Sequence, residues 1–277
     1  MVKTNSVKAW LLATRPKTLS AAAVPVMIGT AFAWRNTSEQ FNWIPAILCL
    51  LFAWIMQIDS NLVNDYFDFK KGNDDETRLG PKRACSEGWI TSEAMVWGIL
   101  ITTLLGCMTG IPLILYGGLE MVMVGIACVV FCFLYTTLFS YHGLGDILVL
   151  LFFGIIPVCC TYYVCMPLHQ QIPTGEVIAS SIACGLAIDA LLIVNNYRDI
   201  DNDRSNGKIT LAVRLGKSKT RRLYESIGYI AAGIMIILVF FDLYQTDKLI
   251  PTYAIYLIYI ILPRQSYQAM QRLSTGA

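Results

Sequence analysis

The sequence is poor in charge and in histidine. Only 14% of its 277 residues are Asp, Glu, Lys or Arg, whereas a soluble globular domain carries about 25%. Two histidines exclude a histidine-rich metal site, and the nine cysteines show no paired metal-ligand spacing. The glycine-rich phosphate loop of nucleoside triphosphatases is absent as well. What remains is a chain that is 56% hydrophobic, which indicates a polytopic membrane protein.

Long apolar segments run through the whole chain, and no linker or low-complexity stretch divides it. A bilayer requires about 20 apolar residues for each helix. We therefore predict one membrane domain, residues 1–277, folded as an all-α transmembrane helix bundle with a central cavity. The eight predicted spans are 18–34, 43–64, 94–116, 119–139, 146–166, 177–197, 226–243 and 249–263.

The basic residues gather on one side of this topology. With the amino terminus in the cytoplasm, 19 of the 21 Lys and Arg residues fall in cytoplasmic segments, and only Arg35 and Lys248 lie outside. Because cytoplasmic loops carry an excess of Lys and Arg, we predict this orientation. The basic residues lie where the membrane topology requires them, so the net charge of +2 does not indicate nucleic-acid binding. We therefore expect no nucleic-acid partner. The sequence does not indicate an oligomeric state.

Two acidic stretches follow apolar spans on the predicted cytoplasmic side. The first acidic stretch is "NLVNDYFDFKKGNDD", residues 61–75, and the second is "NNYRDIDNDRSNGKITLAVRLG", residues 195–216. At 100° per residue, the polar side chains of each stretch share one helix face, within about 60° in the first and about 80° in the second. These side chains are Asn61, Asp65 and Asp68, and Asn195, Asp199 and Asp203.

Oxygen ligands without His or Cys are typical of sites for hard cations such as Mg²⁺. Magnesium in proteins combines one or two carboxylates with substrate phosphates, so the two stretches predict a Mg²⁺–diphosphate site. Basic side chains beside them can bind the phosphate oxygens. The predicted diphosphate ligands are Lys70, Arg78, Lys82, Arg83, Arg198 and Lys208.

A diphosphate at the mouth of an apolar bundle suggests an isoprenoid diphosphate, whose tail lies along the spans. Metal and basic side chains would stabilise the leaving diphosphate, and an aromatic acceptor would attack the allylic cation. Asp189 is an ionisable group about 15 Å deeper than Asp199, which makes it a functional candidate. The predicted acceptor and prenyl pocket contains Arg15, Lys17, Tyr135, Asn195, Tyr197 and Asp189. Arg15 and Lys17 could meet an acceptor carboxylate or simply anchor the topology.

The two acidic stretches together resemble the paired aspartate motifs of the UbiA-type membrane prenyltransferases. "RPKTLSAAAVPVMIG" (15–29), "RLGPKRACSEGWI" (78–90) and "YHGLGD" (141–146) resemble the branch that prenylates 1,4-dihydroxy-2-naphthoate in menaquinone biosynthesis. The resemblance implies that Asp65, Asp68, Asp199 and Asp203 bind the metal and are catalytic, with Asn61 and Asn64 as helpers. It also implies a bacterial plasma-membrane enzyme with polyprenyl diphosphate, naphthoate and membrane lipid as partners.

The same resemblance implies nine transmembrane helices, one more than the eight predicted here. We therefore expect the chain to lack the last helix of the bundle. Three other functions stay open: prenylation of a different aromatic acceptor, phytyl transfer toward phylloquinone, and cation-coupled transport. Transporters place their sites near the bilayer midplane, whereas here the acids cluster at one membrane face. The sequence does not predict the length of the prenyl chain.

Overall fold

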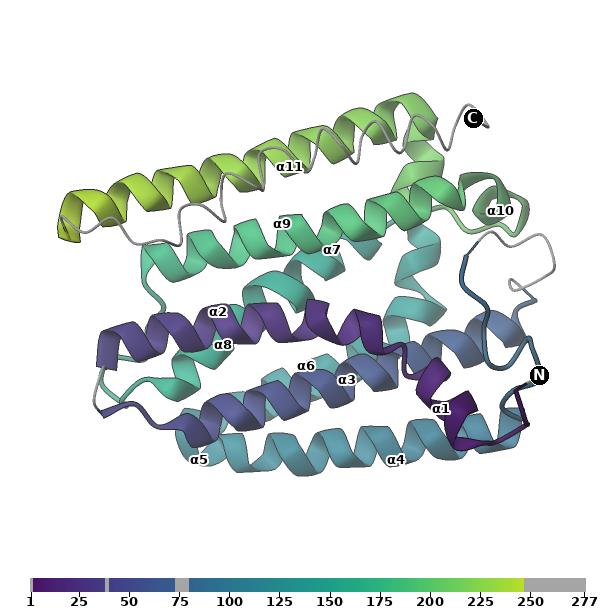
Figure 1. Cartoon of the computed structure of the whole chain (residues 1–277), viewed down its shortest axis with the longest axis horizontal. Coiled ribbons are helices and arrows are strands. Elements are labelled where there is room, and N and C mark those ends of the chain that lie inside the picture. The colour runs from purple at the N-terminus through teal and green to yellow at the C-terminus, as the bar shows by residue number, and fades with distance from the viewer. Residues whose placement is uncertain (1, 38–39, 73–79, 247–277) are drawn as a thin grey trace.

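The computed structural model describes residues 2–37, 40–72 and 80–246, and over these residues it contains helices and no strand (Figure 1). The long helices lie side by side and run back and forth across the bundle. The all-α bundle predicted from the sequence is confirmed. Its elements are α1 (Val7–Ala13), η1 (Pro16–Thr18), α2 (Leu19–Thr37), α3 (Trp43–Lys70), α4 (Ser92–Gly110), η3 (Ile111–Leu113), α5 (Ile114–Gly117), α6 (Glu120–Thr137), η4 (Phe139–His142), α7 (Gly145–Leu150), η5 (Leu151–Ile155), α8 (Ile156–Cys165), α9 (Gly175–Arg198), α10 (Ile200–Ser205) and α11 (Leu211–Thr246).

Six stretches of the described chain are long and apolar enough to cross a membrane. They correspond to six of the predicted spans, and α2 corresponds to the first, 18–34. The predicted span 249–263 lies outside the described residues. The stretches that qualify are Trp43–Lys70, Ser92–Gly117, Glu120–Thr137, Gly145–Cys165, Gly175–Arg198 and Leu211–Phe241.

Two helices differ from their predicted bounds near the acidic stretches. The helix α3 continues to Lys70 instead of ending near residue 64, so the first acidic stretch starts on a helix. The segment 198–225 was expected to be a loop, but it contains α10 and the first turns of α11. Gly216 interrupts α11 with a φ of 72°, a left-handed conformation that glycine adopts without strain.

Polar caps define where several of these apolar helices begin. The side chain of Asn42 accepts a hydrogen bond from the Ile44 backbone N–H at the start of α3. Thr91 caps α4 and Thr174 caps α9 in the same way, through the backbone N–H groups of Ala94 and Val177. Such caps satisfy backbone donors that have no partner inside the helix. The caps therefore determine the residue at which each helix begins.

The segment from α7 to α8 is irregular at the point where it packs on α9. Its middle part, η5, is a π-helix, and Pro157 is the second residue of α8, which follows it. Because proline has no N–H, the Phe153 carbonyl loses its α-helical donor; the thiol of Cys184 on α9 donates to that carbonyl at 3.8 Å. A Cβ atom at Gly154 would lie 2.6 Å from the Gly185 Cα. Close helix contact therefore requires glycine here.

Candidate active site

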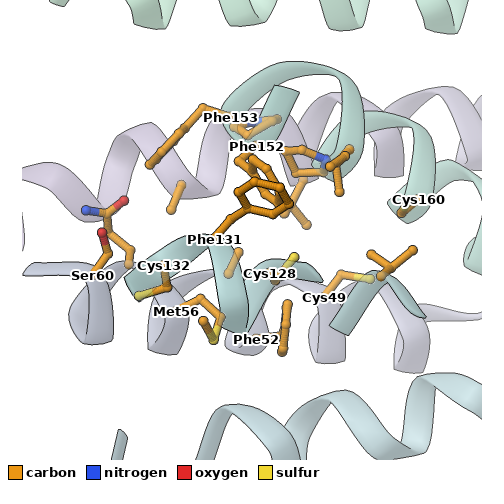
Figure 2. Close-up of a pocket in the computed structure, with 18 of the residues that line it drawn as sticks. Cys49, Phe52, Met56, Ser60, Cys128, Phe131, Cys132, Phe152, Phe153 and Cys160 are labelled. Carbon is orange, nitrogen blue, oxygen red and sulfur yellow. The ribbon is translucent and has the colours of Figure 1, made fainter. Parts of the chain in front are cut away.

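A cavity of about 680 Å³ lies inside the bundle, between α2, α3, α6 and the η5–α8 segment. Its walls are mostly apolar, and Figure 2 shows Phe131, Phe152 and several cysteine side chains pointing into it. The rings of Phe131 and Phe152 contact each other with centroids 4.9 Å apart, so they join α6 to η5 across this space. A long apolar cavity of this kind can hold a hydrocarbon chain away from water.

The polar lining of this cavity is amide-rich. Asn61, Asn64 and Asn195 line it, together with Lys17 and Tyr135. The four predicted metal-binding aspartates, all within the described residues, do not belong to its lining. They lie further along the chain from these asparagines, toward the end of the bundle where α3 and α9 finish (Figure 1). We call this region the acidic end.

Asn61 ties the start of the chain to α3. Its amide donates to the Thr14 carbonyl at 2.9 Å and to the Thr18 hydroxyl at 3.0 Å. The amide of Gln57 donates to the Asn61 side-chain oxygen at 3.2 Å. Arg15, between Thr14 and η1, adopts a left-handed conformation with φ 49°, and its guanidinium lies 4.0 Å from the Asp65 carboxylate. Asn61 was predicted as a metal helper; in the structure its amide nitrogen positions the 14–18 segment.

Asp65 holds the loop that follows α3. The side chain is 1% exposed, and its two oxygens accept hydrogen bonds from the backbone N–H groups of Ala84 and Cys85, each at 2.9 Å. A carboxylate has about four lone-pair sites, so these two bonds leave oxygen capacity for a cation. Asp65 is therefore both a loop anchor and an available ligand.

Asp68 and Asn64 share one basic partner. The Arg83 guanidinium donates to the Asp68 carboxylate at 2.9 Å and to the Asn64 side-chain oxygen at 2.6 Å. Both members of the Arg83–Asp68 ion pair are more than nine-tenths buried. Paired charges at this depth are stable only as long as both remain, since removal of one leaves the other desolvated. The structure thus places Arg83, a predicted diphosphate ligand, against a predicted metal ligand.

The second acidic stretch has a break that helical periodicity did not predict. The helix α9 ends at Arg198, Asp199 has non-helical angles of φ −95° and ψ 8°, and α10 begins at Ile200. The expected continuous stripe through Asn195, Asp199 and Asp203 is therefore divided between two helices. The physical reason is that Asn and Asp compete for backbone hydrogen bonds and favour helix ends.

Both predicted metal ligands of the second stretch, Asp199 and Asp203, have basic partners close in sequence. The Arg198 guanidinium donates to the Asp199 carboxylate through two bonds of 2.8 and 2.7 Å. Lys208 lies 3.5 Å from one oxygen of Asp203. The other oxygen of Asp203 is buried and has no hydrogen-bond partner among the described residues. That oxygen is an available ligand position at the acidic end.

The pKa of Asp203 depends on charges from both acidic stretches. Burial raises the pKa of the Asp203 carboxyl above its usual range, and Lys208 opposes this change. The carboxylates of Asp199 and Asp68 raise the pKa further. Asp68 belongs to α3 and Asp203 to α10, so the charge of the first acidic stretch acts on a carboxyl group of the second. A bound cation would relieve this repulsion.

Within the described residues, no three His, Cys, Asp or Glu side chains converge closely enough to form a ready metal cluster. The donor types nevertheless fit Mg²⁺, because Asp65, Asp68, Asp199 and Asp203 offer only oxygen. Arginine and lysine now occupy several of those oxygens. The acidic end therefore provides oxygen ligands for a hard cation together with basic groups for the anion that accompanies it.

The remaining predicted diphosphate ligands lie in different surroundings. Lys70 is exposed, with its ammonium 5.7 Å from the centre of the Tyr66 ring. Lys82 is exposed and pairs with Glu87 at 2.8 Å. Arg78 lies outside the described residues. Among the described members of this group, Lys70, Lys82 and Arg83, the one that pairs with a predicted metal ligand is Arg83.

Three members of the predicted acceptor pocket lie off the cavity wall: Arg15, which lies beside Asp65, and Tyr197 and Asp189. Tyr197 packs in a cluster between α9 and α11, with Ile193, Tyr224 and Ile227, and it does not line the cavity. Asp189 is 4% exposed, and its Oδ1 has no hydrogen-bond partner in the described chain. It neighbours Ile188, which does line the cavity. Lys17, Tyr135 and Asn195 are the predicted pocket residues that reach the cavity surface.

Sequence reasoning missed a second polar contact on α3. Asp59 is fully buried and accepts hydrogen bonds from the hydroxyls of Thr102 at 2.5 Å and Thr103 at 2.9 Å, both on α4. The thiol of Cys132 on α6 lies 3.8 Å from the same carboxylate. The adjacent threonines in "ITTLLG" were the available signal, since paired hydroxyls in a span need a polar partner.

The described residues form an all-α membrane bundle with an apolar cavity and, at the acidic end, carboxylate oxygens beside basic side chains, an arrangement that suits an amphiphilic, anionic substrate. The chain belongs to the UbiA prenyltransferase family, whose family model matches residues 22–274. It is therefore a membrane prenyltransferase.

Relatives and solved structures agree with this membership. The chain is 38% identical over 251 residues to the 1,4-dihydroxy-2-naphthoate octaprenyltransferase of Escherichia coli, covering 87% of this chain and 79% of the relative. It is 34% identical to the enzyme of the same name from Mycobacterium tuberculosis, covering 83% and 77%. The fold is similar to a UbiA homolog from Archaeoglobus fulgidus bound to GPP and Mg²⁺, with a TM-score of 0.65, 15% identity and coverage of 94% and 86%.

Proposed function

We propose that this chain transfers a polyprenyl group from a polyprenyl diphosphate to 1,4-dihydroxy-2-naphthoate, with Mg²⁺, as a step of menaquinone biosynthesis. The observation that carries the proposal is the juxtaposition of an apolar cavity with the acidic end, where both acidic stretches bring their charge together. The names of relatives more than 30% identical over most of the chain support the choice of acceptor. They also name an octaprenyl donor.

In this proposal Asp65, Asp68, Asp199 and Asp203 hold the Mg²⁺, with Asn64 beside them. Bound there, the metal neutralises the negative charge that develops on the leaving diphosphate. Arg83 and Lys208, which now pair with Asp68 and Asp203, bind the phosphate oxygens when the substrate arrives. Arg83 and Lys208 then exchange a carboxylate partner for a phosphate partner, so neither basic side chain is left without an anion.

The bond changes balance without an external reagent. The allylic carbon–oxygen bond breaks, and its electron pair leaves with the diphosphate. A ring carbon of the naphthoate forms the new carbon–carbon bond, and loss of the carboxylate as carbon dioxide returns an electron pair to the ring. The apolar cavity excludes water from the allylic cation, and ring faces such as those of Tyr135 and Phe131 stabilise it.

Lys17 is the better placed of the two basic residues proposed for the acceptor. It lines the cavity, whereas Arg15 lies beside Asp65. A Lys17→Met variant should raise KM for the naphthoate about 10- to 100-fold, the effect of losing one hydrogen bond to a charged group. The same variant should leave KM unchanged for 1,4-naphthalenediol, which has no carboxylate. An equal rise for both acceptors would exclude carboxylate binding by Lys17.

We also propose a bacterial plasma-membrane location with the acidic end facing the cytoplasm, because Lys and Arg are concentrated on that side of the topology. Cysteine-accessibility labelling of the 80–90 loop in intact cells and in inverted vesicles tests this orientation.

The deciding experiment is turnover by the purified full chain in lipid vesicles. Farnesyl or octaprenyl diphosphate is supplied with the naphthoate, with and without Mg²⁺, and product and diphosphate are both quantified. A prenylated, decarboxylated product that requires Mg²⁺ supports the proposal. If product forms only with a different phenolic acid, that acid is the acceptor instead of the naphthoate. If product requires phytyl diphosphate, the donor is phytyl instead of polyprenyl diphosphate. Cation flux without diphosphate release would favour a transporter.

A further inference from the structure

Most glycines in the apolar helices are explained by close contact. A Cβ atom at Gly29 would collide with the Val158 carbonyl, and one at Gly98 would lie 2.6 Å from the Trp10 ring. The same is true of Gly154 and Gly185, where two helix backbones meet. In each place the small residue lets another group approach. Glycine inside a helix is otherwise less stable than alanine, so a glycine without a neighbour needs another explanation.

Gly125 on α6 is such a glycine. Two glycines line the cavity, Gly110 and Gly125. A Cβ atom at Gly110 would meet the Phe52 ring at 3.2 Å, whereas one at Gly125 would meet no atom within 4 Å among the described residues. The open space beside Gly125 faces the cavity, since Met121 and Cys128, one turn away on the same face of α6, also line it. A side chain at this position would project into the cavity.

The distance of Gly125 from the polar end of the cavity can be compared with the length of a prenyl tail. Tyr135, at the polar end of the cavity, is ten residues further along α6, which corresponds to about 15 Å at 1.5 Å per residue. Both residues line the same cavity. A geranyl tail that starts near Tyr135 ends before Gly125, while a geranylgeranyl tail passes it. A forty-carbon chain is larger than the ligands that cavities of this size enclose, so its tail must extend beyond the depth of Gly125.

We propose that Gly125 determines which prenyl chain lengths the cavity accepts, because its missing side chain keeps open the path of the tail beyond its first isoprene units. This inference rests on the proposed prenyl transfer and adds a specificity-determining residue to it. Gly125 contacts the tail and takes no part in the chemistry at the acidic end.

The test is a graded series at one position. Gly125→Ala, Gly125→Leu and Gly125→Phe are assayed with geranyl, farnesyl, geranylgeranyl and octaprenyl diphosphate at a fixed naphthoate concentration. The ratio of kcat/KM for geranylgeranyl over geranyl should fall about 10- to 100-fold in Gly125→Phe, as expected for steric misfit in an apolar pocket. Gly125→Leu should fall less and Gly125→Ala least. The matched control is Gly233→Phe on α11. A Cβ atom at Gly233 also meets no described atom within 4 Å, but Gly233 does not line the cavity.

A second readout keeps this test separate from turnover. The increase in melting temperature caused by unreactive geranyl and geranylgeranyl thiolodiphosphates is measured for each variant. Loss of the geranylgeranyl increase alone in Gly125→Phe supports the proposal. An unchanged pattern, or an equal loss for both analogues, overturns it. A wild-type chain that binds both analogues but forms no prenylated naphthoate would refute the proposed function and leave the role of Gly125 standing.

Discussion

The two acidic stretches carry similar residues but are held in different ways. In the first, Asp65 binds two backbone N–H groups of a loop about 20 residues away, and Asp68 is buried with Arg83. In the second, Asp199 pairs with the adjacent Arg198, and one oxygen of Asp203 has no partner among the residues that the structure describes. The first stretch is part of the packing of the protein, whereas the second is held by local ion pairs. The same residue types can therefore combine stability and function in one half of a site and serve mainly function in the other.

The sharpest way to break this comparison is to remove one aspartate from each half. Asp65→Ala should reduce turnover about 10³-fold, as expected when a group that stabilises transition-state charge is lost. It should also reduce stability by about 2–4 kcal/mol, because two buried backbone N–H groups lose their acceptor. Asp199→Ala should reduce turnover similarly with less than about 1 kcal/mol of destabilisation. Turnover and melting temperature are measured together, and Asp65→Asn serves as the control that keeps one acceptor oxygen. Equal destabilisation by both alanine variants would contradict the distinction.

The basic partners should differ in the same sense. Arg83→Ala leaves the buried Asp68 carboxylate unpaired, which should reduce stability by about 3–5 kcal/mol. Arg83→Lys restores the charge without the two-pronged geometry that also reaches Asn64, so it should recover part of the loss. Denaturation of the three proteins in the same detergent measures the difference. Melting of Arg83→Ala at the wild-type temperature would show that the pair contributes no stability.

Asp59 offers a comparison between a carboxylate that holds two helices together and the proposed metal ligands. It lies on α3 but contacts Thr102 and Thr103 of α4 instead of the acidic end. Asp59→Asn should lower stability by about 1–2 kcal/mol, because the amide replaces one acceptor oxygen with a donor. The Mg²⁺ concentration that gives half-maximal turnover should stay the same. A shift of that concentration would link Asp59 to the metal site.

The smallest effect is expected at Lys208. Its distance of 3.5 Å from Asp203 and partial exposure indicate a contribution to stability below about 1 kcal/mol. Lys208→Ala should instead raise KM for the prenyl diphosphate by about tenfold, through the loss of one phosphate contact. Steady-state kinetics with Lys208→Arg as the control measure this change. A fall in melting temperature as large as that of Arg83→Ala would remove the asymmetry between the two halves.

The sequence predicted the helical bundle and the residue types of the acidic end, because hydropathy and charge alone determine which segments enter a bilayer. It also predicted that Asn61, Asp65 and Asp68 share a face, since α3 is one continuous helix. It did not predict the break at Asp199, where a local ion pair and polar residues end α9.

Tertiary contacts were the other limit. The backbone N–H groups of Ala84 and Cys85 are partners of Asp65 because of the path that the loop takes. Every residue except proline has a backbone N–H, so residue types do not predict such a contact. Tyr197 was expected in the pocket because it lies near the second acidic stretch, but its helix face packs against α11. Periodicity gives the face of a helix and cannot say which neighbour covers it.

The bond between Asp65 and its loop also bears on how the protein is made. All its members lie between residues 65 and 85, so this half of the site can assemble as soon as α3 and the following loop have left the ribosome. The second acidic stretch is synthesised more than a hundred residues later, a delay on the order of 5 to 20 s at ordinary elongation rates. During that interval the contacts of Asp65 with its loop and the Asp68–Arg83 ion pair can form without α9 and α10, because all their members are already present.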